Sequence, residues 1–419
     1  MLKRLHIRRF RSIHDATLEL GRVNLFIGSN GAGKSNLLEA VGVLSAALGR
    51  GLDSTSLAQR GVRLSLPRMF TSSFKGLEDV GTFEIDAHLN GAARYTLSVA
   101  ANDLRSELQV FAEELEQEGK PVFQRNHNGA RVNQSGGDVV QVTPAEWVAT
   151  RSLWDTHRAV VQLQDRTRTL LDALARYAIY APQTSVMRGV SIEQNPLTPL
   201  GLHGSGVSGA VRTLIKHDQQ HGPTGALDTL RQHYRLSDWV ESAVVGPPNP
   251  EVVPAGVQTG ADVVYFIDRF MREGRNRLSP FDASEGTLYL LFVALLLVHP
   301  ETPPIFALDN VDSTLNPGLV RRLMGILAEA VCDQQGAPST VAQQVFLTSH
   351  NPTALDALDL FNDDHRVFVV HRDAGAHGST RFFRLRPPEG MTREQWVVSK
   401  YGQKLSNLWI DGQLPHALG

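Results

Sequence analysis

The feature that most constrains the fold is the segment G-S-N-G-A-G-K-S at residues 28–35, which satisfies the pattern G-x-x-x-x-G-K-[ST] in full. An apolar run rich in β-branched and aromatic residues precedes it at 23–27, and apolar residues recur at helical spacing over 37–48. The order strand, glycine-rich turn, helix is the context that a phosphate-binding loop requires, and it makes a chance glycine-rich turn the weaker interpretation. In such a loop backbone N–H groups face phosphate oxygens, Lys34 reaches the terminal phosphates, and the Ser35 hydroxyl is placed to ligate Mg²⁺.

The net charge and the hydropathy pattern indicate which partners and which cellular location to expect for this protein. The net charge of −2 excludes a strongly basic surface overall but leaves a local DNA-binding patch open. Residues 3–11 and 60–68 are locally basic, although such runs are more often the solvated side of an element. The longest apolar run, 288–298, is shorter than the roughly 20 residues that span a bilayer, and no signal-peptide pattern opens the chain. We therefore expect a cytoplasmic protein with no membrane partner.

The N-terminal part has strand patterns on both sides of the glycine-rich loop. Residues 1–20 predict two strands that form a hairpin, and the alternating runs 81–89 and 93–99 predict an antiparallel sheet beside the loop. From 104 to about 150 the pattern turns polar, with glycine breakers at 128–129 and 136–137, which is typical of a loop-rich segment bearing hairpins.

The middle of the chain mixes helix and strand signals. Residues 154–177 predict a helix or a helix pair, and 177–180 a short strand. A second glycine cluster at 204–209 fits G-x-G-x-x-G, but it does not stand in the first strand–turn–helix of a dinucleotide-binding domain, so we treat it as a weak signal. Residues 252–267 return to strand-like apolar runs.

Most chemistry-bearing residues lie in the last third. The apolar runs 305–308 and 345–349 each end in a polar residue, Asp309 and His350 respectively. Short apolar strands that alternate with helices imply a parallel sheet with functional residues at the carboxyl ends of its strands. Ser284 directly precedes an apolar helix and is expected to be its N-cap.

Four elements thus occur in chain order: the glycine-rich loop, Ser284-x-Gly286 before an apolar helix, the apolar strand followed by Asp309, and the apolar strand followed by His350. Together they resemble the ATPase head shared by ABC proteins, SMC proteins, RecF and related bacterial ATPases. The segments 5–13 and 23–36 are similar to the RecF-type N-terminus in particular. The resemblance implies an α/β fold of the P-loop NTPase class with a mixed sheet flanked by helices. It divides the head into residues 1–103 and 276–419, and leaves 104–275 as an α+β insertion without a specific match.

The resemblance also implies roles for residues at both ends of the chain. Two heads would sandwich two ATP molecules, with Asp309 as the Walker B ligand of Mg²⁺ through water and Asp312 in the dimer-contacting D-loop. His350 would be the switch histidine near the γ-phosphate, and Ser284 and Gly286 would contact the γ-phosphate held by the second head. Taken singly, an ordinary N-cap and an ordinary strand-end histidine are equally good interpretations of Ser284 and His350. The remaining nucleotide contacts would be Arg11, Asn30, Gly31, Gly33, Lys34, Ser35 and Asn36.

Two departures from the family pattern limit this comparison. The family has a glutamate after the Walker B aspartate to polarise the attacking water, whereas this chain has Asn310, which orients water but cannot take a proton. We therefore predict slow hydrolysis and a long-lived ATP-bound state, unless Asp312 or another carboxylate serves as the base. No glutamine loop is plain, although Gln183 resembles one superficially.

Three functions are compatible with this pattern. The first is an ATP-gated switch of the RecF-like class in a bacterial antiphage defence or DNA-damage system, working as a homodimer or higher even oligomer with a separate effector, a nuclease or a toxin. Overcoming-lysogenization nucleases resemble this head but carry a Toprim domain after it, and we expect none here. The alternative is a DNA-binding ATPase of RecF-like repair. A transporter ATPase subunit fits poorly, because the insertion and Asn310 depart from that pattern.

Overall fold

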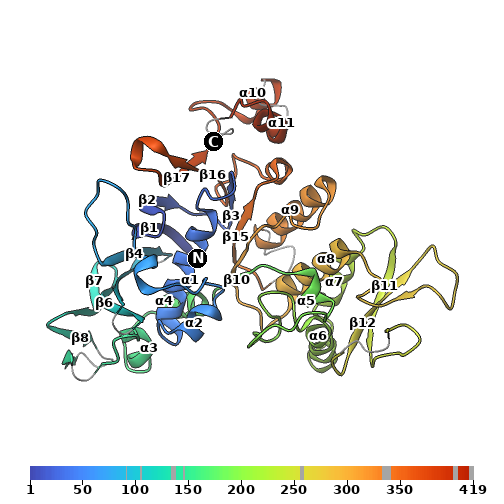
Figure 1. The fold of residues 1–419 in the computed structure, drawn as a ribbon, viewed down its shortest axis with the longest axis horizontal. Coiled ribbons are helices and arrows are strands. Elements are labelled where there is room, and N and C mark those ends of the chain that lie inside the picture. The colour runs from blue at the N-terminus through green and yellow to red at the C-terminus, as the bar shows by residue number, and fades with distance from the viewer. Residues whose placement is uncertain are drawn as a thin grey trace. The chain divides into compact units, whose positions relative to one another are not determined.

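The computed structural model describes residues 1–90, 92–103, 106–133, 138–144, 147–254, 259–332, 341–399 and 404–414. Internal contacts divide the chain into two compact units (Figure 1). Unit 1 comprises Met1–Ile179, Ile305–Ala307 and Gln344–Gly419, and unit 2 comprises Tyr180–Pro304 and Leu308–Gln343. The boundaries expected at 104 and 275 do not coincide with this division, and residue 104 and the glycine pair 136–137 lie outside the described residues.

Unit 1 contains an eight-stranded antiparallel sheet in the order β2-β1-β4-β5-β6-β7-β8-β9. The predicted opening hairpin is confirmed, since β1 (Leu2–Phe10) pairs with β2 (Ile13–Glu19). The two alternating runs are also confirmed as strands, β4 (Thr82–Leu89) and β5 (Ala93–Asn102), and every second side chain of β4 is buried. Four more strands complete the sheet: β6 (Glu107–Gln117), β7 (Lys120–Asn126), β8 (Gly129–Asn133) and β9 (Val139–Val142).

The segment after residue 104 is therefore more regular than its sequence pattern indicates. Its hairpins are present, but they extend the N-terminal sheet instead of forming a loop-rich insertion. In β6, Leu108, Val110 and Leu115 are buried, while several glutamate and glutamine side chains on the same strand are only partly covered. A strand with one covered face needs few apolar residues, so its composition is close to that of a loop.

The P-loop strand lies inside a six-stranded mixed sheet in the order β10-β14-β15-β3-β16-β17. The central strand β3 (Val23–Ile27) is paired in parallel with both β15 (Gln344–Ser349) and β16 (His365–Asp373). All residues of β3, β14 and β15 are buried, which explains why these strands are mostly apolar. The remaining strands are β10 (Ala178–Tyr180), β14 (Ile305–Leu308) and β17 (Ser379–Leu385), the last antiparallel to β16.

The helices of unit 1 are mostly short, apart from α1 (Lys34–Gly49), which follows β3 and contacts α4 (Asp165–Ala175). The sequence predicts a helix or a helix pair over 154–177, and the structure has two helices there, α3 (Leu153–His157) and α4. The others are α2 (Ser54–Ala58), η1 (Pro67–Phe70), η3 (Pro352–Ala357), η4 (Ala374–Ala376), α10 (Arg393–Val398) and α11 (Leu405–Ile410).

Unit 2 is built around α8 (Glu285–Val298), whose residues from Thr287 onward are all buried. A helix that is apolar on every side lies in a core, and within the described part of the chain no helix has the length and apolar character to cross a bilayer. Its other helices are α5 (Thr184–Met187), α6 (Val207–His221), α7 (Ala226–Tyr234) and α9 (Pro317–Cys332). The yellow strands of Figure 1 form a three-stranded sheet of β11 (Val240–Gly246), β12 (Val263–Asp268) and β13 (Arg277–Leu278).

Candidate nucleotide-binding site

The glycine-rich loop joins β3 to α1, and two of its glycines are required by close contacts. Gly33 stands at the N-cap of α1 in the left-handed region, with φ 106°. A Cβ atom on Gly33 would lie 2.2 Å from Oγ1 of Thr380, and one on Gly28 would lie 2.1 Å from the carbonyl oxygen of Val370. The loop therefore fits against β16 and β17 only because these two side chains are hydrogen atoms. Asn30 and Gly31 are exposed at its tip.

Lys34 lies underneath this loop. Its side chain is nearly buried, and Nζ donates hydrogen bonds to the carbonyl oxygens of Gly28 at 2.7 Å and Ser29 at 2.9 Å. The ammonium group thus holds the curl of the loop and brings a positive charge to the N-terminal end of α1. A helix N-terminus with a lysine beside it is a site that favours an anion such as a phosphate group.

A buried cluster of hydroxyl groups fixes the loop from behind. Oγ1 of Thr380 on β17 donates to the carbonyl oxygen of Ala32 at 2.8 Å and lies 2.7 Å from Oγ of Ser12. Nδ2 of Asn36 donates to the same Ser12 hydroxyl at 2.6 Å. The hairpin turn after β1, the first turn of α1 and strand β17 are therefore tied to one another through the loop. Ser12 and Thr380 were missed by sequence reasoning, and no local pattern marks them.

Arg11 is held by α1 and not by the loop. Its Nε lies 2.7 Å from a carboxylate oxygen of Glu39, and its guanidinium stacks on the Phe70 ring at 4.4 Å. Burial lowers the pKa of Arg11, and the nearby Glu39 carboxylate opposes that change. Arg63 also pairs with Glu39. Contact between Arg11 and nucleotide phosphates, which the resemblance implies, stays a prediction.

His350 comes to the same edge of the sheet as the loop. Strands β15 and β3 run parallel with Ser349 opposite Ile27, so His350 and Gly28 each follow directly after a paired position. His350 is exposed. Asp309 follows β14, which is the neighbour of β15 in the sheet order. The predicted parallel sheet is thus confirmed for β3 and β15, while the roles of Asp309 and His350 stay predictions.

The turn after Asp309 lies against the segment around Ser284 and Gly286, here called the signature segment, within unit 2. The backbone N–H of Asp309 donates to the carbonyl oxygen of Tyr180 at 2.9 Å. Asn310 and Thr314 both have positive φ, 57° and 70°, so the chain turns sharply after the strand. A Cβ on Gly286 would lie 3.2 Å from the Leu315 side chain, which places the start of α8 against this turn.

Tyr289 lies buried close to these acidic residues. Burial is the first cause that raises the pKa of its hydroxyl, and the carboxylates of Asp312 and Asp309 raise it further. Among the described residues its hydroxyl has no hydrogen-bond partner. Sequence reasoning missed Tyr289 because it stands inside an apolar run that predicts only a core helix.

Three hydroxyl groups form a chain that ends at Ser284. The expected N-cap is confirmed, since Oγ of Ser284 accepts from the backbone N–H of Thr287 at 3.3 Å. Oγ1 of the buried Thr287 lies 2.7 Å from Oγ of Ser284 and 2.8 Å from Oγ of Ser237. If Ser237 donates to Thr287 and Thr287 to Ser284, the Ser284 hydroxyl already accepts two hydrogen bonds and turns its own proton outward. Ser284 itself is exposed, so that proton faces solvent.

The second glycine cluster, at 204–209, does not form an anion site. It leads into α6 with Gly206 as the N-cap, at φ 83°. The carboxylate of Glu193 occupies its donors: it accepts from the backbone N–H groups of His203 at 3.1 Å and Ser205 at 3.3 Å, and from Oγ of Ser205 at 2.7 Å. A carboxylate of the chain itself thus occupies the donors that a phosphate would need. This agrees with the treatment of the glycine pattern at 204–209 as a weak signal of a dinucleotide-binding loop.

The comparisons with known proteins agree with this geometry. Residues 23–356 match the model of a protein family described as "AAA domain, putative AbiEii toxin, Type IV TA system". The chain belongs to this family. Its head is of the ABC/SMC/RecF-like ATPase type, and the members of this class are in general ATPases.

Relatives of this AAA-domain chain include two proteins named DNA replication and repair protein RecF. The one from Caulobacter vibrioides is 49% identical over 61 residues, which cover 14% of this chain and 15% of that protein. The one from Magnetococcus marinus is 56% identical over 45 residues, covering 10% and 12%. The chain therefore matches less than one sixth of the length of either relative.

A solved structure of an SMC head bound to the C-winged helix domain of ScpA is similar in fold. It superposes with a TM-score of 0.53 at 14% identity, covering 93% of this chain and 99% of that one. The SMC head domain from Thermotoga maritima superposes at 0.43 with 16% identity, covering 92% and 99%. The first match confirms the predicted α/β fold of the SMC-head type for this member of the AAA-domain family.

Proposed function

We propose that this chain is an ATP-dependent switch that dimerises around two nucleotides, hydrolyses ATP slowly and controls a separate effector in a bacterial toxin–antitoxin or antiphage system. The observation that carries the proposal is the glycine loop curled over Lys34, with His350 at the same sheet edge by the register of β3 and β15. The family description, which names a type IV toxin–antitoxin system, favours the defence setting. A cytoplasmic location stays part of this proposal.

ATP and Mg²⁺ fit the residues that the chain offers. Side chains on Gly28 and Gly33 would collide with neighbouring atoms, so the loop is a backbone cradle that triphosphate oxygens can approach. Among the described residues no three His, Cys, Asp or Glu side chains are grouped to hold a metal. Mg²⁺ at such sites takes one or two protein ligands plus phosphate oxygens and water, and Ser35 and Asp309 would be those ligands. Bound Mg²⁺ would neutralise the charge that develops on the phosphates.

The residues around the cradle have distinct tasks in this proposal. Lys34 and the first turn of α1 orient the terminal phosphates, and His350 senses the γ-phosphate. Ser284 and Gly286 of a second head close over the nucleotide, with Asp312 at the contact between heads. Gln183 follows β10, the neighbour of β14 in the sheet order, which supports its assignment as the glutamine-loop residue. Because the signature segment contacts the turn after Asp309, dimer closure and hydrolysis are coupled inside each chain.

Replacing Asn310 by glutamate is expected to speed phosphate release by about 10-fold or more, because a carboxylate at this position can accept a proton from the attacking water. The residue has φ 57°, a conformation that asparagine tolerates better than glutamate, so the variant should also lose about 1 kcal/mol of stability. Single-turnover phosphate release and thermal unfolding measure the two effects.

The matched control is Asn310→Gln, which has the length of glutamate and its backbone cost but no carboxylate. Faster release in Asn310→Glu alone would support a switch whose slow turnover is set at this position. Equal rates in the parent chain and both variants would refute that role for residue 310.

Replacing Thr287 by valine is expected to weaken ATP-dependent dimerisation by about 2-fold to 12-fold, the equivalent of the ~0.5–1.5 kcal/mol that one hydrogen bond contributes. Valine has nearly the shape of threonine but no hydroxyl, so it can neither accept a hydrogen bond from Ser237 nor donate one to Ser284. Sedimentation with and without ATP measures the dimer. The control Ser284→Ala removes the donor itself and should weaken the dimer at least as much; a Thr287→Val dimer of normal strength would exclude the hydroxyl chain.

DNA repair of the RecF kind is the second candidate. The local matches to two RecF proteins favour it, since they are proteins named for replication and repair. The basic runs that suggested it are partly neutralised by carboxylates: Arg8 and Arg9 share Glu84, and Arg68 pairs with Asp103. ATP hydrolysis stimulated by gapped duplex DNA, in a chain that acts on no effector, would favour repair over the switch.

A further inference from the structure

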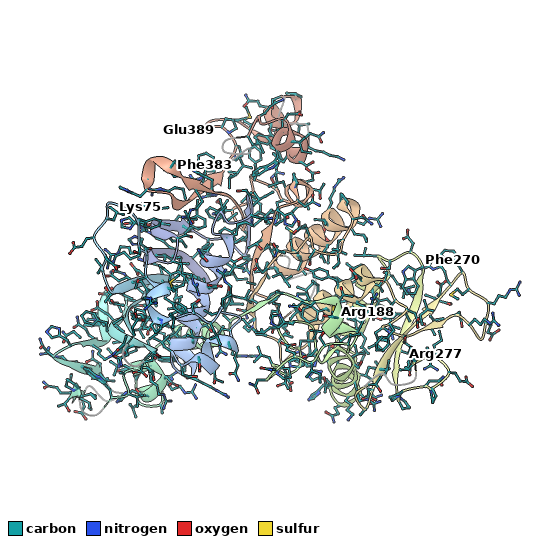
Figure 2. The ribbon with its side chains drawn as sticks, viewed as in Figure 1. Lys75, Arg188, Phe270, Arg277, Phe383 and Glu389 are labelled. Atoms are coloured by element: carbon teal, nitrogen blue, oxygen red, sulfur yellow. The ribbon has the colours of Figure 1, made fainter. Side chains whose placement is uncertain are left out.

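The turn between β12 and β13 carries the sequence R-F-M-R-E-G-R-N-R at residues 269–277, here called the arginine turn. Its arginines at 269, 272, 275 and 277 are all exposed. Phe270 is 76% exposed and Met271 43%. Figure 2 labels Phe270 in this turn and Arg277 at the start of β13. An exposed aromatic ring among four arginines is unusual for a surface that meets only water.

The arginine turn carries more positive than negative charge. None of its arginines pairs with a carboxylate among the described residues, in contrast to the arginines of β1. Asp268, which precedes the turn, accepts instead from the backbone N–H groups of Phe270 at 2.7 Å and Met271 at 3.2 Å. Glu273 is the only carboxylate within the turn, which leaves a local excess of positive charge on a chain whose net charge is −2.

Two of the arginines are already held in place. The guanidinium of Arg277 lies over the Tyr265 ring at 4.2 Å, and Arg269 donates to the carbonyl oxygen of Val240 at 3.1 Å. The backbone is closed by hydrogen bonds from Asp268 N to Asn276 O at 2.8 Å and from Arg275 N to Arg272 O at 3.0 Å. A preordered turn loses little conformational entropy when it binds a ligand.

We propose that the arginine turn binds single-stranded DNA. Arginine presents a planar fork of donors that suits phosphate groups, and the charge of the turn selects a polyanion. The guanidinium of Arg269 lies over the Phe270 ring at 5.9 Å, and the ring is still 76% exposed. Its exposed surface suits a second flat partner, which an unpaired base provides and the stacked bases of a duplex do not. An acidic protein surface satisfies the arginines but leaves Phe270 without such a partner. The site lies apart from the glycine loop in sequence and does not depend on the proposed switch.

The test is fluorescence anisotropy of a labelled oligodeoxythymidine of about 20 nucleotides, longer than the roughly 4–16 nucleotides that one single-strand-binding domain covers. The double variant Arg272→Ala/Arg275→Ala is expected to weaken binding and to reduce the slope of log affinity against log salt by about 1.4, because two phosphate contacts are lost. Phe270→Ala is expected to weaken binding by about 5-fold to 150-fold, the equivalent of the ~1–3 kcal/mol of one stacked base. Phe270→Trp should keep it.

The matched control is Arg321→Ala/Arg322→Ala, which removes two adjacent exposed arginines of α9 in the same unit and should leave binding unchanged. If both double variants lose the same amount of DNA affinity, the loss follows from the change in net charge and not from the arginine turn, and the proposal is overturned. Binding of duplex DNA in preference to single strands, equal binding of a polyglutamate peptide, or no binding of DNA by the parent chain would also overturn it. Circular dichroism of each variant confirms that the fold is intact.

Discussion

Replacing Lys34 by alanine is expected to lower the rate of ATP hydrolysis by about 100-fold to 1,000-fold, the usual effect of removing one donor that stabilises charge in a transition state. The side chain is nearly buried and its Nζ donates to the Gly28 and Ser29 carbonyl oxygens, so alanine removes both the charge and the bonds that hold the loop. Phosphate release by the purified protein, with light scattering in the presence and absence of ATP, measures turnover and assembly together.

The control for Lys34→Ala is Lys75→Ala, because Lys75 belongs to the same unit and is exposed (Figure 2). It should hydrolyse ATP and assemble as the parent chain does. If Lys34→Ala retains the parent rate, the glycine loop is not the site of hydrolysis, and the proposed switch loses its basis.

Replacing Glu113 by alanine is expected to reduce the free energy of unfolding by about 3–5 kcal/mol, because it leaves a buried guanidinium without its counter-charge. Glu113 on β6 pairs with Arg125 on β7 at 3.0 Å, and both side chains are shielded from solvent. Glu113 also accepts from the hydroxyl of Tyr95 at 2.9 Å and from the backbone N–H of Leu153 at 2.8 Å. Burial raises the pKa of the Glu113 carboxyl even against the attraction of Arg125. Denaturant unfolding measures the loss.

Two variants test whether burial is the cause of that loss. Glu84→Ala removes a more exposed partner of Arg8 and Arg9, and should cost only about 0–1 kcal/mol. The double variant Glu113→Leu/Arg125→Leu removes both buried charges and should recover most of the stability. A loss in Glu113→Ala no larger than that in Glu84→Ala would contradict the effect of burial.

The sequence predicts those elements whose pattern is set by local physics. β3, β14 and β15 were expected because a strand buried on both faces is mostly apolar, and the loop before α1 because its glycines and Lys34 are specific in type and spacing. Strands β6–β9 were less evident, since one covered face in a large antiparallel sheet leaves room for many polar residues.

Contacts between distant segments could not be predicted. Thr380 supports the loop from a strand whose pattern indicates only that it closes a sheet. The basic run at 3–11 suggested a nucleic-acid surface because Glu39 and Glu84, which pair with three of its arginines, lie elsewhere in the chain. The arginine turn is about as rich in arginine as residues 3–11, and its sequence alone did not mark it as a site. The two segments differ in the partners of their arginines, since Arg8 pairs with Glu84 whereas Arg277 lies over the Tyr265 ring.

The support of the loop by Thr380 has a consequence for synthesis of the protein. During translation, β3, the loop and α1 leave the ribosome long before β16 and β17, which supply Val370 and Thr380. A nascent chain that ends before residue 380 lacks the atoms against which Gly28 and Gly33 fit, so its loop has no fixed shape to offer a triphosphate. The proposed capture of a nucleotide is thus deferred until β17 has been made, and a nascent polypeptide that ends before residue 380 does not compete for that nucleotide.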